Sequence, residues 1–147
     1  MPVTVERSLG PEDVPQLVDL YETYDWWADR GETELRRALA ATDEAVALRE
    51  TESGDLVAAA RVLTDYSYYA MVFDVIVHAD RRGEGLGEEL LAALVTHPPL
   101  ADVDLELLSR EGLVPFYEAC GFEEVGAVDR PGGDPEELRF LAYRRDE

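Results

Sequence analysis

The stretch HADRRGEGLG, at residues 78–87, constrains the fold of this chain more than any other. It follows the apolar segment AMVFDVIVH (70–78), which is typical of a strand, and it precedes a leucine-rich segment with helical spacing. A strand that enters a helix through glycines leaves backbone N–H groups free at the helix start, where the helix dipole attracts anions. Glycines let a ligand approach the backbone, and Arg82 adds a positive charge. The stretch therefore predicts a strand, loop and helix whose loop binds a phosphate group.

Two common nucleotide-binding motifs do not fit this loop. A dinucleotide fingerprint has the spacing G-x-G-x-x-G, whereas the glycines here fall at 83, 85 and 87 and Glu88 follows. A P-loop needs a lysine, and this chain has none. A glycine turn that binds no ligand is the alternative that the residues alone leave open.

The rest of the chain alternates between strand-like and helix-like segments, without a repeat or a linker. The order of the elements, β-α-α-β-β-β-α-β-α-β-β, predicts one α+β domain over residues 1–147. Since residues 70–78 are almost continuously apolar, we expect a central strand covered on both faces. The turn-rich segment DRPGGDPE (129–136) joins the last two strands. Strands are expected at 3–6, 45–50, 56–64, 70–78, 103–108, 122–125 and 137–144, and helices at 11–21, 33–41, 86–97 and 112–121.

The charge balance is strongly acidic. The chain carries 33 acidic and 13 basic residues, a formal net charge of -20, and all of these basic residues are arginine. Such a surface repels phosphates, which argues against binding to nucleic acid or to anionic membranes. High salt screens the self-repulsion, so we expect a halophilic host, with an acidic protein of an ordinary cytoplasm as the alternative. No segment has the pattern of a signal peptide or a membrane span, so we expect a cytoplasmic location.

Two motifs carry a resemblance to a known family. Arg82, Gly85 and Gly87 match the R/Q-x-x-G-x-G/A motif of the GCN5-related N-acetyltransferases, the GNAT family, and FYEACGF (116–122) is similar to its later Y…GF signature. The resemblance covers roughly residues 45–125 in the same order of elements. It implies a mixed, mostly antiparallel sheet of about six to seven strands, flanked by about four helices. It also implies transfer of an acetyl group from acetyl-CoA to a primary amine, by direct attack in a ternary complex and without a metal. A CoA-binding regulatory module without catalysis is the alternative.

The resemblance also implies which residues bind acetyl-CoA. Backbone groups of Val75, Ile76 and Val77 would bind the pantetheine arm in the manner of an added strand. An asparagine that touches the cofactor in many relatives is replaced here by Ser109 and Arg110. Glu84, an acid within the loop, is expected to point to solvent. The pyrophosphate would lie on the backbone of Arg82, Gly83, Glu84, Gly85, Leu86 and Gly87.

Tyr117 and Asp74 are the candidate catalytic residues. Tyr117 matches the position of a family tyrosine that protonates the leaving thiolate, and a core tyrosine is the alternative. Asp74 interrupts an apolar strand, so we expect either a general base or a structural ion pair with Arg61. Glu106 and Asp65 are weaker candidates for the base.

An aromatic wall is expected around the acceptor, which would be a small-molecule or peptide amine. The resemblance places the segment between the first two helices at the acceptor pocket, and aromatic faces attract cations. Plain core packing is the alternative. The expected wall consists of Tyr24, Trp26, Trp27, Tyr66 and Tyr69.

Three further residues and the oligomeric state complete the expectations. His78 is expected to end a strand, and His97 is expected to cap a helix C-terminus as a cation. Cys120 is expected to be a buried core residue, and no metal site is expected. A homodimer is an option, and the strand at 137–144 could form it.

Overall fold

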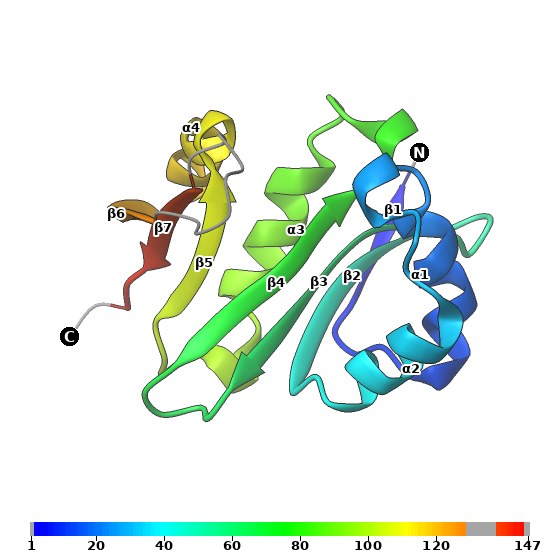
Figure 1. Cartoon of the computed structure of the whole chain (residues 1–147), viewed down its shortest axis with the longest axis horizontal. Helices are drawn as coiled ribbons and strands as arrows, with labels where there is room; N and C mark the ends of the chain where they lie inside the picture. The colour runs from blue at the N-terminus through cyan, green and yellow to red at the C-terminus, as the bar shows by residue number, and fades with distance from the viewer. Residues whose placement is uncertain (1, 129–137, 146–147) are drawn as a thin grey trace.

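The structure, a computed structural model, describes residues 2–128 and 138–145. Its centre is a seven-stranded sheet in the order β1-β2-β3-β4-β5-β7-β6 (Figure 1). Only the pair β4–β5 is parallel, and the other neighbouring strands are antiparallel. The predicted mixed, mostly antiparallel α+β fold is therefore confirmed. The strands are β1 (Val3–Glu6), β2 (Glu44–Glu50), β3 (Leu56–Thr64), β4 (Ala70–Val77), β5 (Leu105–Arg110), β6 (Glu123–Val128) and β7 (Leu138–Tyr143).

Two pairs of helices cover the two faces of the sheet. One core cluster joins α1 and α2 to sheet residues such as Ala47 and Ile76. The other joins α3 and α4 to Val46, Leu48 and the inner side of β5. Neighbouring residues of one strand thus belong to different clusters, as the alternation of strand side chains requires. The helices are α1 (Val14–Tyr21), α2 (Glu32–Ala40), α3 (Leu86–Val95) and α4 (Val114–Ala119).

The strands β4 and β5 share only a short stretch of pairing. Their register is defined at Met71 and Glu106. In Figure 1 they lie close together where β4 begins and diverge toward its C-terminal end, and α3 is seen in the opening. The second half of β4 therefore has backbone groups on this side that are not used for pairing with β5. We call this opening the β4–β5 gap.

The expectation that β4 is covered on both faces is wrong for its first half. Phe73 is 37% exposed, and Met71 is only half-buried. The cluster under α1 and α2 reaches β4 at Ile76, near its end. An apolar strand sequence cannot distinguish a covered face from a face left open, because both are built from the same residues.

The C-terminus of α3 is capped by arginines, so the expectation that His97 caps it is wrong. Arg7 donates to the carbonyl of Ala93 at 2.9 Å, and Arg145 donates to the carbonyl of Val95 at 2.8 Å. His97 is buried and contacts Glu44 through Nε2 at 2.7 Å and Arg7 through Nδ1 at 3.3 Å. A guanidinium group offers several donors at once, which suits a cluster of carbonyl oxygens better than an imidazole does.

The last strand in sequence is not an edge of the sheet. β7 lies between β5 and β6, so it cannot offer a free edge to a second copy. A homodimer through this strand would need another geometry.

The turn expected at 129–136 lies outside the described residues. In the ranges that the structure describes, no helix is long and apolar enough to cross a membrane.

Candidate functional site

The glycine loop joins β4 to α3 in an open conformation. Gly83 and Gly85 both have φ of +81°, a conformation that side chains disfavour. A Cβ added at Gly83 would meet no atom within 4 Å, and one at Gly85 would meet only Glu88 Oε2 at 3.8 Å. The loop backbone is exposed from Arg82 to Gly85, and the buried side chain of Leu86 anchors the first turn of α3. The space above the loop can thus admit a phosphate group close to the N–H groups of the helix start.

Gly87 serves packing. A Cβ there would lie 2.9 Å from Phe116 Cζ, so the absence of a side chain lets α4 pack against the first turn of α3. The matched glycine of the motif therefore connects the loop to the helix that carries Tyr117. This contact was not predicted from the sequence, in which all three glycines were interpreted as space for a ligand.

Arg81 and Arg82 have different roles beside the loop. Arg81 donates from Nε to Glu84 at 2.9 Å and from Nη1 to Glu50 at 2.8 Å. The carboxylate of Glu84 is therefore exposed but paired with Arg81, which reduces its repulsion of an anion in the loop. Arg82 is exposed, and its guanidinium lies 5.8 Å from the ring centre of Tyr24.

The segment between α1 and α2 is bonded to the end of β4. Tyr24 Oη donates to the carbonyl of Val77 at 2.6 Å, and Thr23 Oγ1 accepts from the N–H of Ala79 at 3.3 Å. Val77 is one of the three residues predicted to bind the pantetheine arm. A ligand that used its carbonyl would have to share the oxygen with the hydroxyl of Tyr24 or displace it.

Tyr117 lies in the core cluster on the α3 and α4 side of the sheet. It is 6% exposed, and its ring packs edge-on against Phe116 at 5.0 Å and Phe122 at 5.8 Å. Burial, with a smaller effect of Cys120, raises the pKa of Tyr117 to about 12, so the phenol keeps its proton at neutral pH. Within the described residues the hydroxyl makes no hydrogen bond, which leaves it available to a ligand.

Asp74 is held by two arginines. Its carboxylate accepts from Arg30 Nη1 at 2.8 Å and Nη2 at 3.2 Å, and from Arg61 Nε at 2.7 Å. Burial alone would raise the pKa of Asp74, but the hydrogen bonds and charges of the two arginines outweigh it and hold the pKa below its usual value. The predicted ion pair with Arg61 is present, and this geometry favours that alternative over the general base. Arg30 was missed, because nothing local marks a partner 44 residues away in sequence.

The structure brings together only part of the predicted aromatic wall. Tyr24, Trp26 and Trp27 form one cluster, with ring centres 4.9 to 6.1 Å apart. Tyr66 and Tyr69 lie in the connection before β4, at the strand end opposite to the one that Tyr24 contacts.

Arginines of the chain itself lie over the rings of this cluster. Arg82 lies over Tyr24, Arg30 lies 5.8 Å from Trp27, and Arg110 lies 4.6 Å from Trp26. The last contact joins the segment before α2 to the end of β5.

The comparison with family models decides the family. A model described as an acetyltransferase (GNAT) domain matches residues 28–133, which is most of the chain. The chain belongs to the GNAT family. The resemblance carried by the two motifs is therefore confirmed.

Two of the curated relatives of this GNAT chain are plant proteins named as chloroplastic. Serotonin N-acetyltransferase 2, chloroplastic, of Oryza sativa subsp. japonica is 33% identical over 145 residues, which are 96% of this chain and 67% of the relative. GCN5-related N-acetyltransferase 2, chloroplastic, of Arabidopsis thaliana is 33% identical over 89 residues, 60% of this chain and 31% of the relative. The chain spans 31% to 57% of the first three curated relatives it matches.

Solved structures share the fold at low sequence identity. The ribosomal-protein-S18-alanine N-acetyltransferase of Escherichia coli has a TM-score of 0.80 and 20% identity, with 96% of this chain and 92% of that chain covered. An aminoglycoside 6'-N-acetyltransferase complexed with coenzyme A has a TM-score of 0.74 and 17% identity, with 99% and 100% covered. These likenesses show the GNAT fold alone.

Of the two weaker candidates for the base, Glu106 is half-buried in β5 at the register position of Met71, and Asp65 is engaged in its own turn. Asp65 accepts from three backbone N–H groups of its own turn, so it stabilises the connection before β4. Ser109 is buried, and its hydroxyl donates to the carbonyl of Arg110. Cys120 is half-buried against the core, and burial raises the pKa of its thiol. In the part of the chain that the structure describes, no cluster of His, Cys, Asp and Glu is arranged to hold a metal ion.

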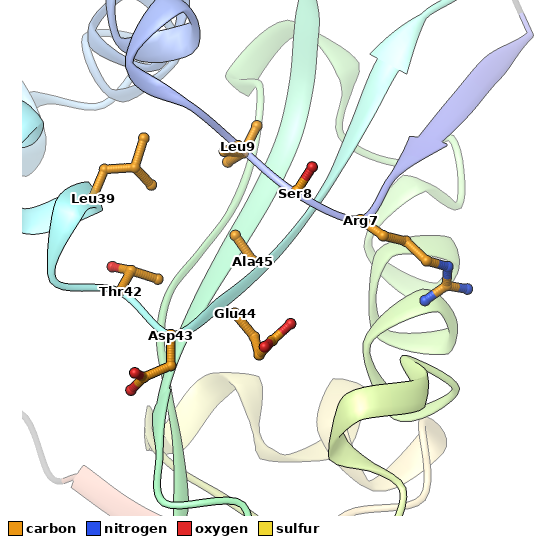
Figure 2. Close-up of a pocket in the computed structure, with 8 residues that line it drawn as sticks. All are labelled: Arg7, Ser8, Leu9, Leu39, Thr42, Asp43, Glu44 and Ala45. Carbon is orange, nitrogen blue, oxygen red and sulfur yellow. The ribbon is translucent and has the colours of Figure 1, made fainter.

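A small hollow lies away from the β4–β5 gap. Figure 2 shows it between the chain that follows β1, the end of α2 and the start of β2. None of the predicted catalytic or cofactor-binding residues lines it. Its lining residues are Arg7, Ser8, Leu9, Leu39, Thr42, Asp43, Glu44 and Ala45.

Proposed function

We propose that this protein is an acetyl-CoA-dependent N-acetyltransferase that acts on a primary amine in a ternary complex. The observation that carries the proposal is the β4–β5 gap, with the open glycine loop after β4 and Tyr117 in the core cluster on the α3 and α4 side of the sheet. The site of an acyl donor and the site of an acceptor can then lie on opposite faces of the sheet.

The residues around the gap fit acetyl-CoA. The exposed loop from Arg82 to Gly85 leads into the start of α3 and offers its backbone to the pyrophosphate, and β4 offers the backbone of Val75, Ile76 and Val77 for the pantetheine arm. The pairing of Glu84 with Arg81 reduces the repulsion between this carboxylate and an anion in the loop. When bound, acetyl-CoA supplies the acetyl group as a thioester.

The chemistry requires two proton movements. The amine nitrogen attacks the thioester carbon, a C–N bond forms, the C–S bond breaks, the nitrogen loses a proton and the thiolate gains one. Tyr117, with its proton held and its hydroxyl unengaged, donates a hydrogen bond to the leaving sulfur, and the thiolate then takes its proton from water. The amine delivers its own proton to water, because the two arginines reduce the tendency of Asp74 to accept it.

The acceptor is proposed to be a small-molecule or peptide amine that enters on the α1 and α2 side. The aromatic cluster of Tyr24, Trp26 and Trp27 borders this side, but arginines of the chain already lie over its rings. The support for a cationic acceptor is therefore weaker than the sequence suggested. Matched cationic, neutral and anionic amines would measure the preference directly.

The test is thiol release from acetyl-CoA over a panel of amines in molar salt. Amine-dependent release, with a stoichiometric acetylated product identified by mass spectrometry, supports the proposal. Binding of CoA without turnover on any amine would instead favour the regulatory module.

We further propose that the protein acts in a salt-rich cytoplasm, on the basis of its net charge of -20.

A further inference from the structure

Asp74 has a backbone conformation that needs outside support. Its φ is +56°, in the left-handed region, within a strand whose pairing to β3 shifts register between Ala59 and Arg61. A residue other than glycine keeps such a conformation only where its surroundings determine it. The side chain is 10% exposed and makes three hydrogen bonds to guanidinium groups. These bonds supply the support.

The same carboxylate connects three separate parts of the chain. Asp74 belongs to β4 and Arg61 to β3, while Arg30 belongs to residues 22–31, which we call the α1–α2 segment. Arg61 also donates to Thr42 Oγ1, just after α2, at 3.3 Å. Through its two arginines, the carboxylate is thus linked to both ends of α2, directly to Arg30 before it and by way of Arg61 to Thr42 after it.

From Arg30 a series of contacts crosses the β4–β5 gap. The guanidinium of Arg30 lies over the ring of Trp27, Trp27 packs against Trp26 at 6.1 Å, and Trp26 lies under Arg110 of β5. Trp26 is 54% exposed, so its position depends on these contacts more than on burial. The α1–α2 segment is therefore held over the opening from the Asp74 side.

We propose that Asp74 is a positioning residue, which holds the α1–α2 segment over the gap through Arg30 and so sets the affinity for the acceptor amine. The statement that Asp74 sets the affinity for the acceptor amine rests on the proposed function. The statement that Asp74 holds the α1–α2 segment through Arg30 does not depend on that function. On this proposal Asp74 takes no proton during the reaction.

The two tryptophans report on the segment without any activity. Both tryptophans of the chain, Trp26 and Trp27, lie in it. We expect Asp74→Asn to increase the quenching of tryptophan fluorescence by acrylamide, because the part of the segment that carries the tryptophans loses its anchor through Arg30, while Tyr24 and Thr23 still bond to the end of β4. Asparagine tolerates a left-handed backbone, so the variant changes mainly the charge. Glu32→Gln is the matched control, since it breaks an exposed pair with Arg36 in α2 and should leave quenching unchanged.

Arg30→Gln removes the same ion pair with Asp74 from the side of the α1–α2 segment. The side chain of Arg30 is 32% exposed, so this variant perturbs the core less if Asp74→Asn fails to fold by circular dichroism. We expect the same increase in quenching. Quenching at the wild-type level in a folded Asp74→Asn or Arg30→Gln variant would overturn the proposal.

Kinetics separate positioning from proton transfer. We expect both variants to raise the KM of the acceptor by about fivefold or more, the size of a modest coupling between sites, with the KM of acetyl-CoA and the pH profile unchanged. If Asp74 were the base, Asp74→Asn would lower kcat instead. Arg30→Gln would then shift the acidic limb to higher pH, since loss of a cation raises the pKa of a carboxyl. That pattern would refute the positioning role. A wild-type protein that acetylates no amine would refute the proposed function, and the fluorescence would still decide the role of Asp74.

Discussion

Tyr117→Phe isolates one hydroxyl in an otherwise unchanged core. The ring is held between Phe116 and Phe122, and the hydroxyl makes no hydrogen bond within the described residues. The variant therefore leaves no internal donor or acceptor unpaired, and we expect its melting temperature to stay within about 2 °C of the wild type. Any loss of activity can then be assigned to the chemistry.

The expected loss follows from the state of the phenol. Its pKa of about 12 means that it is protonated throughout a neutral assay. Full transfer to a thiolate, whose thiol has a reference pKa of about 8.5, would be uphill by roughly 5 kcal/mol. Tyr117 therefore acts mainly as a hydrogen-bond donor to the sulfur as charge develops. Loss of this donor should lower kcat by about 10²-fold, or about 2.7 kcal/mol in the barrier.

Thiol release at saturating amine measures the effect. Tyr143→Phe is the matched control, because Tyr143 packs against Phe122 in the same aromatic cluster at 5.5 Å. The role of Tyr117 is refuted if its variant keeps kcat within about threefold, which is under 1 kcal/mol. An equal loss in Tyr143→Phe would show that the cluster and not the hydroxyl matters.

Four further outcomes are expected. Gly85→Asp should abolish CoA binding in calorimetry, whereas Gly54→Asp, at φ of +79° in the hairpin before β3, should strain the backbone equally and bind CoA normally. Arg145→Ala removes hydrogen bonds to three carbonyls, so the free energy of unfolding should fall by about 3 kcal/mol and the melting temperature by roughly 6–12 °C. An unchanged melting temperature would show that these hydrogen bonds of Arg145 do not stabilise the fold. The depressed pKa of Asp74 contributes stability above its unfolded value of about 3.9 that is lost as pH falls through the folded value. The difference in unfolding free energy between wild type and Asp74→Asn should thus be constant above about pH 5 and shrink below about pH 4; a constant difference to pH 2 would contradict it. The melting temperature should rise from dilute buffer to molar salt, and a flat response would argue against adaptation to salt.

Most of the fold could be predicted because its signals are local. Alternation, helical spacing and turn residues place the helix predicted at 33–41 within one residue of Glu32–Ala40. The strand predicted at 103–108 begins two residues later, since Val103 still belongs to the turn after α3, where its N–H bonds to Leu100. The glycines at 83 and 85 predicted a loop between β4 and α3, and both adopt the left-handed conformation that few other residues take.

The site could be predicted only in part because its contacts are not local. In sequence, Gly87 looks like the other loop glycines, and only the fold places Phe116 against it. Tyr24 and Tyr69 look equally suited to one wall, yet they lie at opposite ends of β4. The partner of an isolated acid such as Asp74 is likewise set by the packing of distant elements.

The cations around Asp74, the glycine loop and the aromatic cluster share one chemical property. Arg30, Arg61, Arg82 and Arg110 are all guanidinium groups, and the chain contains no lysine. Lysine side chains are the common targets of acetylation, which would remove the charge that these ion pairs and ring contacts need. A protein that holds a reactive thioester beside such a framework could inactivate itself if the framework were built from lysine. Built from arginine, its own scaffold offers no ε-amine to compete with the acceptor.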